Sequence, residues 1–343
     1  MRSGKPSRIS LRKHWISPAL RAHFDSLEKY IYPIRAPARS QILTLISDME
    51  LTSACMRCLL DRREEQLHKF SDEEKKADYF REILGIISRE GKVESAPYLS
   101  VEMKKVYERY FGEKEDFSEI KRFYNELMLS MEPEFEKRIR ESGDPVRTAL
   151  CFAQTANYID FGTGNEIKKD TLLELFDGAD PAEIDEKEYE NFSREMKDAK
   201  TVVLLADNCG EIVLDKLLLK ILKEKYPKAS YTLMVRGMPV SNDVTREDAL
   251  QVRVQEVADI MDNGTDIGGT APNHVPQSVR DFLTKADVII AKGQGNFETA
   301  YGSGWPIYYL FLCKCDLFMR RFGKKKFGGM FVHESRVKDA CLM

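Results

Sequence analysis

The chain has 343 residues, of which 43% are apolar and 32% charged, and its formal net charge is −3. This length suits one large domain or two domains with sizeable cores. The small net charge argues against a dedicated nucleic-acid binder, and the apolar stretches are too short for a membrane helix. We therefore expect a globular protein with neither nucleic acid nor a membrane as its partner.

The first 40 residues differ from the rest in charge. They hold nine Lys or Arg residues and two acidic residues, so they carry +7, whereas the remainder carries −10. This segment has no apolar core of a secretory signal; its composition suits a solvated extension or an organellar transit peptide. We predict a basic extension over residues 1–45. The seven cysteines do not resemble a disulfide scaffold, which predicts a reducing, cytoplasmic location.

The next part of the chain has the apolar spacing of helices. Apolar stripes with this spacing lie near residues 41–68, 73–88 and 101–111. Asp144-Pro145 predicts a helix start, with Asp as the N-cap and Pro at the first helical position. The clearest stripe, which we expect to be buried along one helix face, comprises Phe117, Ile120, Phe123, Tyr124, Leu127 and Met128.

Short apolar runs rich in β-branched residues replace this pattern near residue 200. The runs are 201–205, 231–235 and 287–291, with a fourth at 306–312. Such runs are typical of buried parallel strands, and the Leu-rich segment 212–222 between the first two predicts a strand–helix–strand unit.

We therefore predict an α/β fold, in which a Rossmann-like, mostly parallel sheet flanked by helices carries an N-terminal all-helical domain. The expected boundaries are 46–165 for the helical domain, 166–198 for an acidic connecting segment and 199–343 for the α/β domain, which we expect to bind metal and phosphate.

Polar clusters follow three of the predicted strands, at 207–211, 236–245 and 292–298. Each cluster alone could be a turn or a helix cap. Ligands of open α/β sheets bind at the carboxyl ends of the strands, however, so we expect the three clusters to form one site.

The residue types in these clusters suit a divalent metal and a phosphate. Carboxylate and amide oxygens are ligands for Mg²⁺ or Mn²⁺, glycines let backbone N–H groups approach an anion, and Arg or Lys neutralises phosphate oxygens. The dinucleotide-binding, P-loop and nucleophile-elbow motifs are absent from the sequence.

With their spacing, these clusters resemble the damage-control phosphatase family, also called domain of unknown function 89, which has an acidic-residue methyltransferase-like fold. The resemblance covers about residues 50–335, and Cys55-x-x-Cys58 points to the stand-alone subgroup. The matching stretches are Asp207-Asn208-x-Gly210-Glu211-x-x-x-Asp215, Arg236-Gly237-x-Pro239-x-x-Asn242-Asp243-x-Thr245, Lys292–Glu298, Asn157–Gly162, Asp262–Asp266 and Lys314-Cys315.

The resemblance implies a metal-dependent phosphatase that hydrolyses small phosphorylated metabolites such as sugar phosphates. It assigns a divalent metal (Mn²⁺, Mg²⁺, Co²⁺ or Ni²⁺) to Asp207, Asn208 and Asp243, with both aspartates catalytic. Asn263 departs from an expected Thr, and Leu312 stands where Lys is frequent. The implied substrate and phosphate contacts are Glu211, Arg236, Asn242, Lys292, Gly293, Gln294, Gly295, Asn296 and Lys314.

Several alternatives stay open at the level of sequence. The metal could activate a water with a carboxylate as base, or Asp207 could attack phosphorus and form an aspartyl-phosphate. A non-enzymatic sugar-phosphate-binding module is a second possible function. A carboxyl methyltransferase that uses S-adenosylmethionine is a third, although the usual glycine-rich loop is absent.

The pair Cys55 and Cys58 has three interpretations: packing, a redox or zinc site that Cys313 and Cys315 could complete, or lining of the active site. Asp160 could reach the site or cap a helix.

Overall fold

The computed structural model describes residues 51–159 and 169–341, all of which belong to one compact unit, Asp48–Met343. The predicted extension over 1–45 and Asp160 lie outside the described residues. Within the described ranges, no helix has the length and apolar character needed to cross a membrane. The predicted domain boundaries remain predictions.

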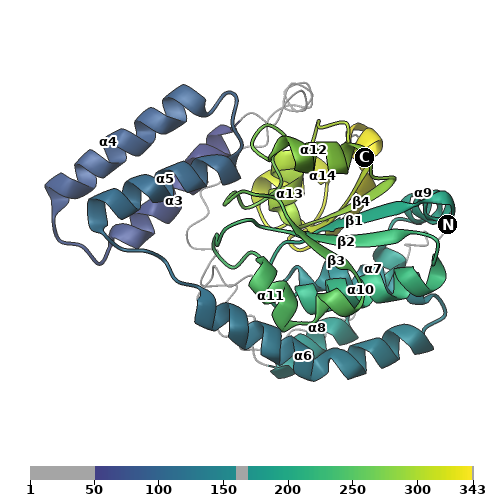
Figure 1. The fold of residues 1–343 in the computed structure, drawn as a ribbon. Coiled ribbons are helices and arrows are strands. Elements are labelled where there is room, and N and C mark those ends of the chain that lie inside the picture. The colour runs from purple at the N-terminus through teal and green to yellow at the C-terminus, as the bar shows by residue number, and fades with distance from the viewer. Residues whose placement is uncertain (1–50, 160–168, 342–343) are drawn as a thin grey trace, which may run out of the picture. The chain divides into compact units, whose positions relative to one another are not determined.

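The described residues form a six-stranded sheet with the order β3-β2-β1-β4-β5-β6. All neighbouring strands run parallel except β5 and β6, which pair antiparallel. This arrangement confirms the predicted α/β fold with a mostly parallel sheet (Figure 1). The strands are β1 (Thr201–Leu205), β2 (Ser230–Val235), β3 (Asp259–Asp262), β4 (Val288–Lys292), β5 (Ile307–Leu312) and β6 (Gly329–His333).

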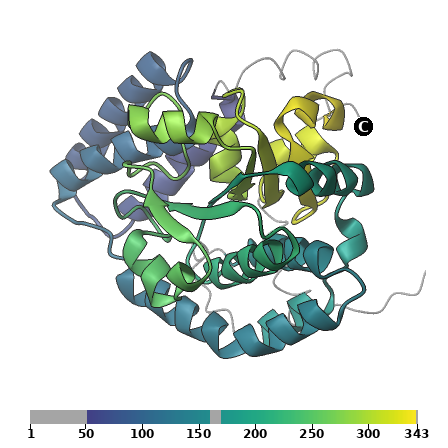
Figure 2. The ribbon, with the colours of Figure 1, turned by 45° about the vertical axis from the view of Figure 1, so that its right-hand side comes forward.

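Helices cover both faces of the sheet, which explains the nearly continuous apolar runs of β1, β4 and β5 (Figure 2). Successive side chains of β1 enter two different cores. Val202 and Leu204 pack with α7 and α10, whereas Val203 and Leu205 pack with α12, α13 and α14. The helices are α6 (Ser118–Glu141), α7 (Pro145–Ala156), α10 (Ile212–Lys225), α12 (Gln277–Thr284), α13 (Gly293–Ala300) and α14 (Asp316–Phe322).

Three helices at the start of the described chain form a separate small core. They are α3 (Ser53–Leu67), α4 (Glu73–Glu90) and α5 (Ala96–Phe111). On its other side α5 packs Val101 against Ile267 and Ala271, in the loop that follows β3. This contact brings the helical part against a loop at the carboxyl edge of the sheet.

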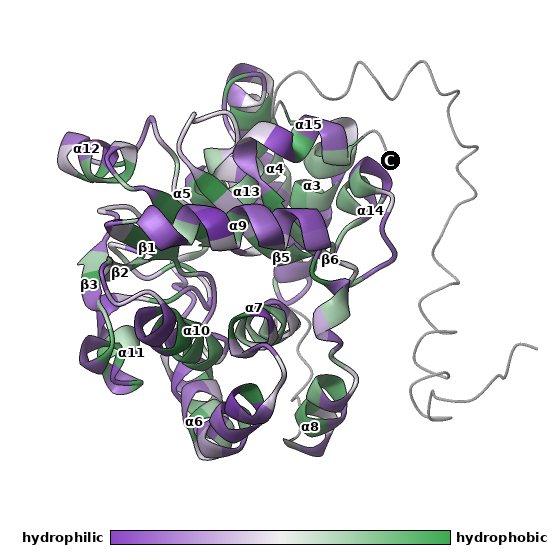
Figure 3. Cartoon of the chain, turned by 90° about the vertical axis from the view of Figure 1, so that its right-hand side faces the viewer, coloured by the Kyte–Doolittle hydropathy of each residue, from purple (hydrophilic) through white to green (hydrophobic). Residues whose placement is uncertain are grey.

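The acidic segment 166–198 contains two helices, α8 (Lys169–Asp177) and α9 (Glu186–Asp198). Phe192 and Met196 of α9 are buried in the core, while the face of α9 turned to the viewer in Figure 3 is mostly hydrophilic. The acidic composition therefore reflects the outer face of an amphipathic helix. The remaining elements are α11 (Arg246–Gln251), α15 (Val337–Ala340) and the 3₁₀ turns η4 (Pro181–Glu183), η5 (Val254–Glu256) and η6 (Glu334–Arg336).

The predicted buried stripe on α6 is partly wrong. Tyr124 and Met128 are buried, but Ile120 and Phe123 are 37% and 50% exposed. The helix turns a polar face inward here, because Lys121 pairs with Asp248 of α11 at 2.5 Å. By contrast, α7 begins as predicted, with the Asp144 side chain accepting a hydrogen bond from the Arg147 N–H and Pro145 in the first turn.

Candidate active site

The three predicted polar clusters meet at the carboxyl ends of β1, β2 and β4. Backbone hydrogen bonds join the first two: the Val244 N–H donates to the Asp207 carbonyl, and the Cys209 N–H donates to the Asn242 carbonyl, each at 2.9 Å. The third cluster lies directly against the first, since a Cβ placed on Gly293 would lie 1.9 Å from Asp207 Oδ2. The expectation of a shared location thus agrees with the geometry.

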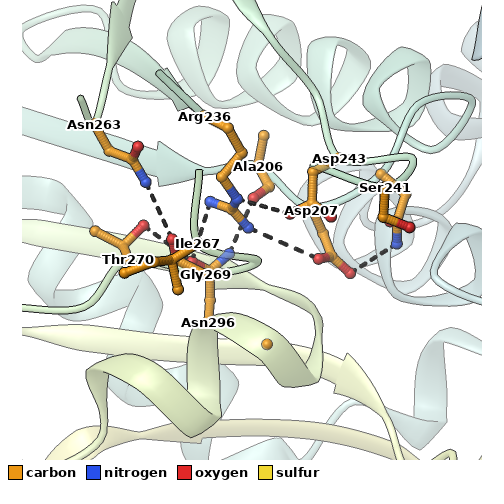
Figure 4. Close-up of polar contacts among 12 residues, drawn as sticks. Ala206, Asp207, Arg236, Ser241, Asp243, Asn263, Ile267, Gly269, Thr270 and Asn296 are labelled. Atoms are coloured by element: carbon orange, nitrogen blue, oxygen red, sulfur yellow. Dashed lines mark hydrogen bonds and ion pairs between the residues drawn. The ribbon is translucent and has the colours of Figure 1, made fainter. Parts of the chain in front are cut away.

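Two carboxylates lie at the centre of this edge. Asp207 and Asp243 are only 8% and 6% exposed. Between them lies Arg236, whose Nε donates to Asp243 Oδ2 at 2.7 Å and whose Nη2 lies 3.9 Å from Asp207 Oδ1 (Figure 4). Burial raises the pKa of Asp207 well above its usual value, and the charges of Glu211 and Asp243 add to the rise. Burial likewise raises the pKa of Asp243, against the opposing charge of Arg236.

A second set of charges lies beneath the first and is completely buried. Lys292 Nζ is 2.6 Å from Asp215 Oδ1 and 3.7 Å from Glu211 Oε1. Burial alone would lower the pKa of Lys292, but the two carboxylates outweigh that effect and raise it. Burial raises the pKa of Asp215 to about 7, even though Lys292 opposes the rise. The structure therefore turns Lys292, a predicted phosphate contact, toward these carboxylates.

The charges of these buried groups do not balance. Against the two cations Arg236 and Lys292 there are four carboxylates, an excess of two negative charges when all are ionised. Uncompensated buried charge is costly, and it is relieved either by protonation, which the raised pKa values of Asp207 and Asp215 favour, or by one divalent cation. The carboxylates are those of Asp207, Glu211, Asp215 and Asp243.

The predicted ligand set of two carboxylates and one amide suits a hard divalent cation. An isolated β-bridge between Asn208 and Asp243 brings the amide and one carboxylate into neighbouring positions. Among the described residues, no group of three or more His, Cys, Asp or Glu side chains is arranged to hold a metal. The predicted set is of another kind, because its third member is the Asn208 amide.

Two glycines lie beside the carboxylates, and of these two Gly293 is the one that has no room for a side chain. Gly293 has φ of +77°, and its missing side chain would overlap the carboxylate of Asp207. A Cβ on Gly268 would lie 4.0 Å from both carboxylate oxygens of Asp243. A close approach of backbone to a ligand is a common reason for glycine at such positions.

Within ranges 51–159 and 169–341, two buried donors at this edge have no hydrogen-bond acceptor. They are Arg236 Nη2 and Asn242 Nδ2. Buried polar groups in folded proteins are nearly always paired, so an unpaired donor in a polar site indicates that an acceptor from outside the chain belongs there. An anionic oxygen meets that need for both groups.

The other predicted contacts hold the site together from below. Asn296 is fully buried, and its Nδ2 donates to the carbonyls of Lys292 and Ala206 at 2.7 and 3.0 Å. The Oδ1 of Asn296 accepts from Thr270 Oγ1 at 3.0 Å (Figure 4). Gln294 Oε1 accepts from the Lys314 N–H at 2.5 Å, which joins the start of α13 to the segment that follows β5.

Two further predicted residues lie close to this framework. Gly295 packs against the carbonyl of Gly268, which a Cβ would meet at 2.2 Å. The positive charge of Lys314 acts on Asp207 and opposes the rise in its pKa.

Sequence reasoning missed the roles of three buried asparagines. Asn157, which follows α7, donates to both Asp207 and Glu211. Asn125 Oδ1 accepts from the N–H of Gly210 at 2.7 Å. Asn263, where Thr was expected, accepts from the Gly237 and Thr265 N–H groups and shapes the loop after β3. Asn157 and Asn263 had a signal, since both lie in stretches that resemble the family, whereas Asn125 looks like any polar residue of a helix.

The cysteine pair lies on α3, with Cys55 half-buried and Cys58 exposed, and both are free thiols. Burial raises the pKa of Cys55. Cys313 is buried in the core on one side of the sheet, where burial raises its pKa to about 12. A metal or redox role for Cys55 and Cys58 stays a prediction.

A buried acidic site at the carboxyl edge of a parallel sheet defines a class of α/β protein that binds small ligands there. A family model described as the damage-control phosphatase ARMT1-like domain matches residues 51–328. The chain therefore belongs to this family, as the sequence motifs implied.

Individual relatives agree with this assignment. A protein named damage-control phosphatase from Archaeoglobus fulgidus is 32% identical over 225 residues, which cover 64% of this chain and 76% of that protein. A second damage-control phosphatase, from Pyrococcus horikoshii, is 27% identical over 220 residues, 62% of this chain and 72% of that protein. A crystal structure of a Pyrococcus horikoshii protein of the domain of unknown function 89 family has the same fold, with a TM-score of 0.68 and 22% identity, over 83% of this chain and 99% of that one.

Proposed function

We propose that the chain is a divalent-metal-dependent phosphatase that hydrolyses small phosphorylated metabolites such as sugar phosphates. The observation that carries the proposal is the combination of two buried carboxylates with two buried donors, Arg236 Nη2 and Asn242 Nδ2, that have no acceptor in the described part of the chain. The carboxylates suit a cation, and the donors suit the oxygens of a phosphoryl group. The names of the relatives support phosphatase activity in general.

In this proposal Asp207, Asn208 and Asp243 hold the divalent metal. When bound, the metal polarises the phosphoryl group and lowers the pKa of a coordinated water. Mn²⁺, Mg²⁺, Co²⁺ and Ni²⁺ are the ions to test, because the ligand set consists of oxygens.

Arg236 and Asn242 bind and orient the phosphoryl group. The Nε of Arg236 stays on Asp243 at 2.7 Å, so the guanidinium is already held in place before a substrate arrives. A donor that is fixed in advance costs no reorganisation during the reaction, which makes its stabilisation of developing charge effective.

Glu211, Asp215 and Lys292 support this site from below. Lys292 is completely buried between the two carboxylates, and no part of its side chain is exposed. We assign it the task of fixing Glu211, whose Oε1 accepts from the backbone N–H of Asn208 at 3.1 Å. The segment that carries two of the metal ligands is thereby held in one conformation.

The decisive experiment is phosphate release from a panel of phosphorylated metabolites, with each of the four metals and with a chelator. We expect release that depends on metal, and its abolition in Asp207→Ala and Asp243→Ala. Asp281→Ala is the matched control, since this carboxylate is exposed on α12. Wild-type-like release from either active-site variant would contradict the proposal. Binding of sugar phosphates without release under any metal would favour a non-enzymatic binding module.

We also propose a cytoplasmic location. All seven cysteines are free thiols, as expected in a reducing compartment.

A further inference from the structure

Asn157 is a fully buried amide in contact with the proposed metal site. It follows the last turn of α7, and its Nδ2 donates to Asp207 Oδ2 at 3.0 Å and to Glu211 Oε2 at 2.9 Å. One neutral amide nitrogen therefore bridges two carboxylates that would otherwise repel each other across a buried space.

The orientation of this amide is fixed by its other end. Asn157 Oδ1 accepts from the backbone N–H of Leu312, the last residue of β5, at 3.2 Å. A flipped amide would turn its oxygen toward two carboxylates and its NH₂ group toward an N–H, so that three contacts would become repulsive. The chemistry of the neighbours thus permits a single orientation.

This contact also determines how Asp207 is held. Asp207 Oδ2 accepts from Asn157 and from the Asn208 side chain at 2.9 Å, while Oδ1 lies on the side of Arg236. Two donors on one oxygen fix the rotation of the carboxylate. Asn157 also connects this carboxylate to α7 and, through Leu312, to β5.

We propose that Asn157 is a positioning residue. It orients Asp207 by bridging it to Glu211, and it thereby sets the affinity of the site for its divalent metal. The inference rests on the proposed function. Residues that hydrogen-bond to metal ligands fix the geometry of those ligands, and their loss weakens metal binding or activity by about 10–100-fold.

The test is the dissociation constant of Mn²⁺, measured by calorimetric titration of the metal-free full-length protein. We expect Asn157→Ala to weaken Mn²⁺ binding by about 10–100-fold. We expect kcat at saturating Mn²⁺ to fall less than activity at limiting Mn²⁺. Should Asn157→Ala not fold, the Mn²⁺ affinity is measured instead on Asn157→Ser, which keeps one short donor.

Gln154→Ala is the matched control. Gln154 is a buried amide one turn earlier on α7, and its Nε2 donates to the Met330 carbonyl at 2.8 Å, away from the carboxylates. Its loss should lower stability and leave the Mn²⁺ affinity unchanged. A folded Asn157→Ala variant with wild-type Mn²⁺ affinity would overturn the inference alone. A wild-type protein that neither binds Mn²⁺ nor releases phosphate would overturn the proposed function first.

Discussion

Gly293 connects β4 to α13 at the point where the backbone passes the carboxylate of Asp207. Its φ of +77° is one that residues with a Cβ rarely adopt, and the space for a Cβ is already filled. Two separate constraints therefore act on this one position. Gly302 shares only the first, with φ of +87° and open space around it.

The pair of glycines separates these constraints. We expect Gly302→Ala to lose about 1–2 kcal/mol of unfolding free energy, the usual cost of a left-handed conformation for a residue with a Cβ, and Gly293→Ala to lose more because its Cβ also overlaps Asp207. Only Gly293→Ala should also displace Asp207 and reduce kcat/KM by more than about tenfold, since small misplacements of a reacting group are costly. Urea unfolding and phosphate release measure the two effects, and equal kcat/KM values in the two variants would contradict the prediction.

Glu298 of α13 gives a pH dependence that can be assigned to one side chain. Burial raises its pKa to about 7, from a usual value of 4.5. The folded state then binds a proton more tightly than the unfolded state, so this group stabilises the fold at low pH. The stabilisation is lost as the pH rises from about 4.5 to about 7.

Replacing Glu298 with Gln removes that titration. We expect the variant to gain stability relative to the wild type as the pH rises from 5 to 8, because the wild type alone must ionise a buried carboxyl. Chemical denaturation of both proteins across this range is the measurement. A difference in unfolding free energy that does not change with pH would show that Glu298 is normally ionised.

At the scale of the element, α6 shows how packing overrides a sequence pattern. The apolar stripe predicted one buried face, yet the polar contacts of Lys121 and Asn125 with α11 and with Gly210 rotate the first turns of the helix. Adjacent aromatic residues consequently differ in burial, with Tyr124 1% and Phe123 50% exposed.

This difference predicts unequal effects of two neighbouring substitutions. Tyr124→Ala should cost about 3–5 kcal/mol of unfolding free energy, as truncation of buried aromatic residues does. Phe123→Ser should change it by less than about 1 kcal/mol, as most surface changes do. Denaturant titrations of both variants test the orientation of α6, and a large loss of stability in both variants would support the predicted stripe instead.

The strands that could be predicted from sequence are those that are buried along most of their length. The strands β1, β2, β4 and β5 are apolar runs because helices cover both of their faces. The two strands that were missed lie at the edges of the sheet: β3 begins and ends with Asp, and β6 begins with Gly. Neither forms an apolar run long enough to stand out.

The same distinction applies to the candidate site. Asp207 and Asn208 could be chosen because they come just after a recognisable strand, and Asp243 because it lies in the polar cluster that follows the next one. Asn157 and Asn125 reach the site from helices 50 and 85 residues away in sequence from their partners. Only the packing of those helices on the sheet reveals such contacts. Lys292 was predicted to contact phosphate because of its charge. The direction of its side chain, however, depends on Asp215, which lies one turn after Glu211 on α10.

At the scale of the whole molecule, the family match and the described structure both begin at residue 51, beyond the basic first segment. We expect deletion of residues 1–45 to leave kcat/KM within about twofold, because the proposed metal ligands and phosphate contacts all lie beyond residue 200. Phosphate release by the truncated and full-length proteins is the comparison. Loss of activity in a truncated protein that remains folded would mean that the extension contributes to the site.

The central strand β1 lends alternate side chains to two cores, one on each side of the sheet, and the site begins at the residue after Ala206. Neither layer can loosen without disturbing this strand and the loop that leaves it. Many proteins open locally to admit ligands, but we expect no such local opening at this end of β1. The candidate active site should therefore be rigid. In a denaturant titration, we expect phosphatase activity and tertiary structure to be lost together.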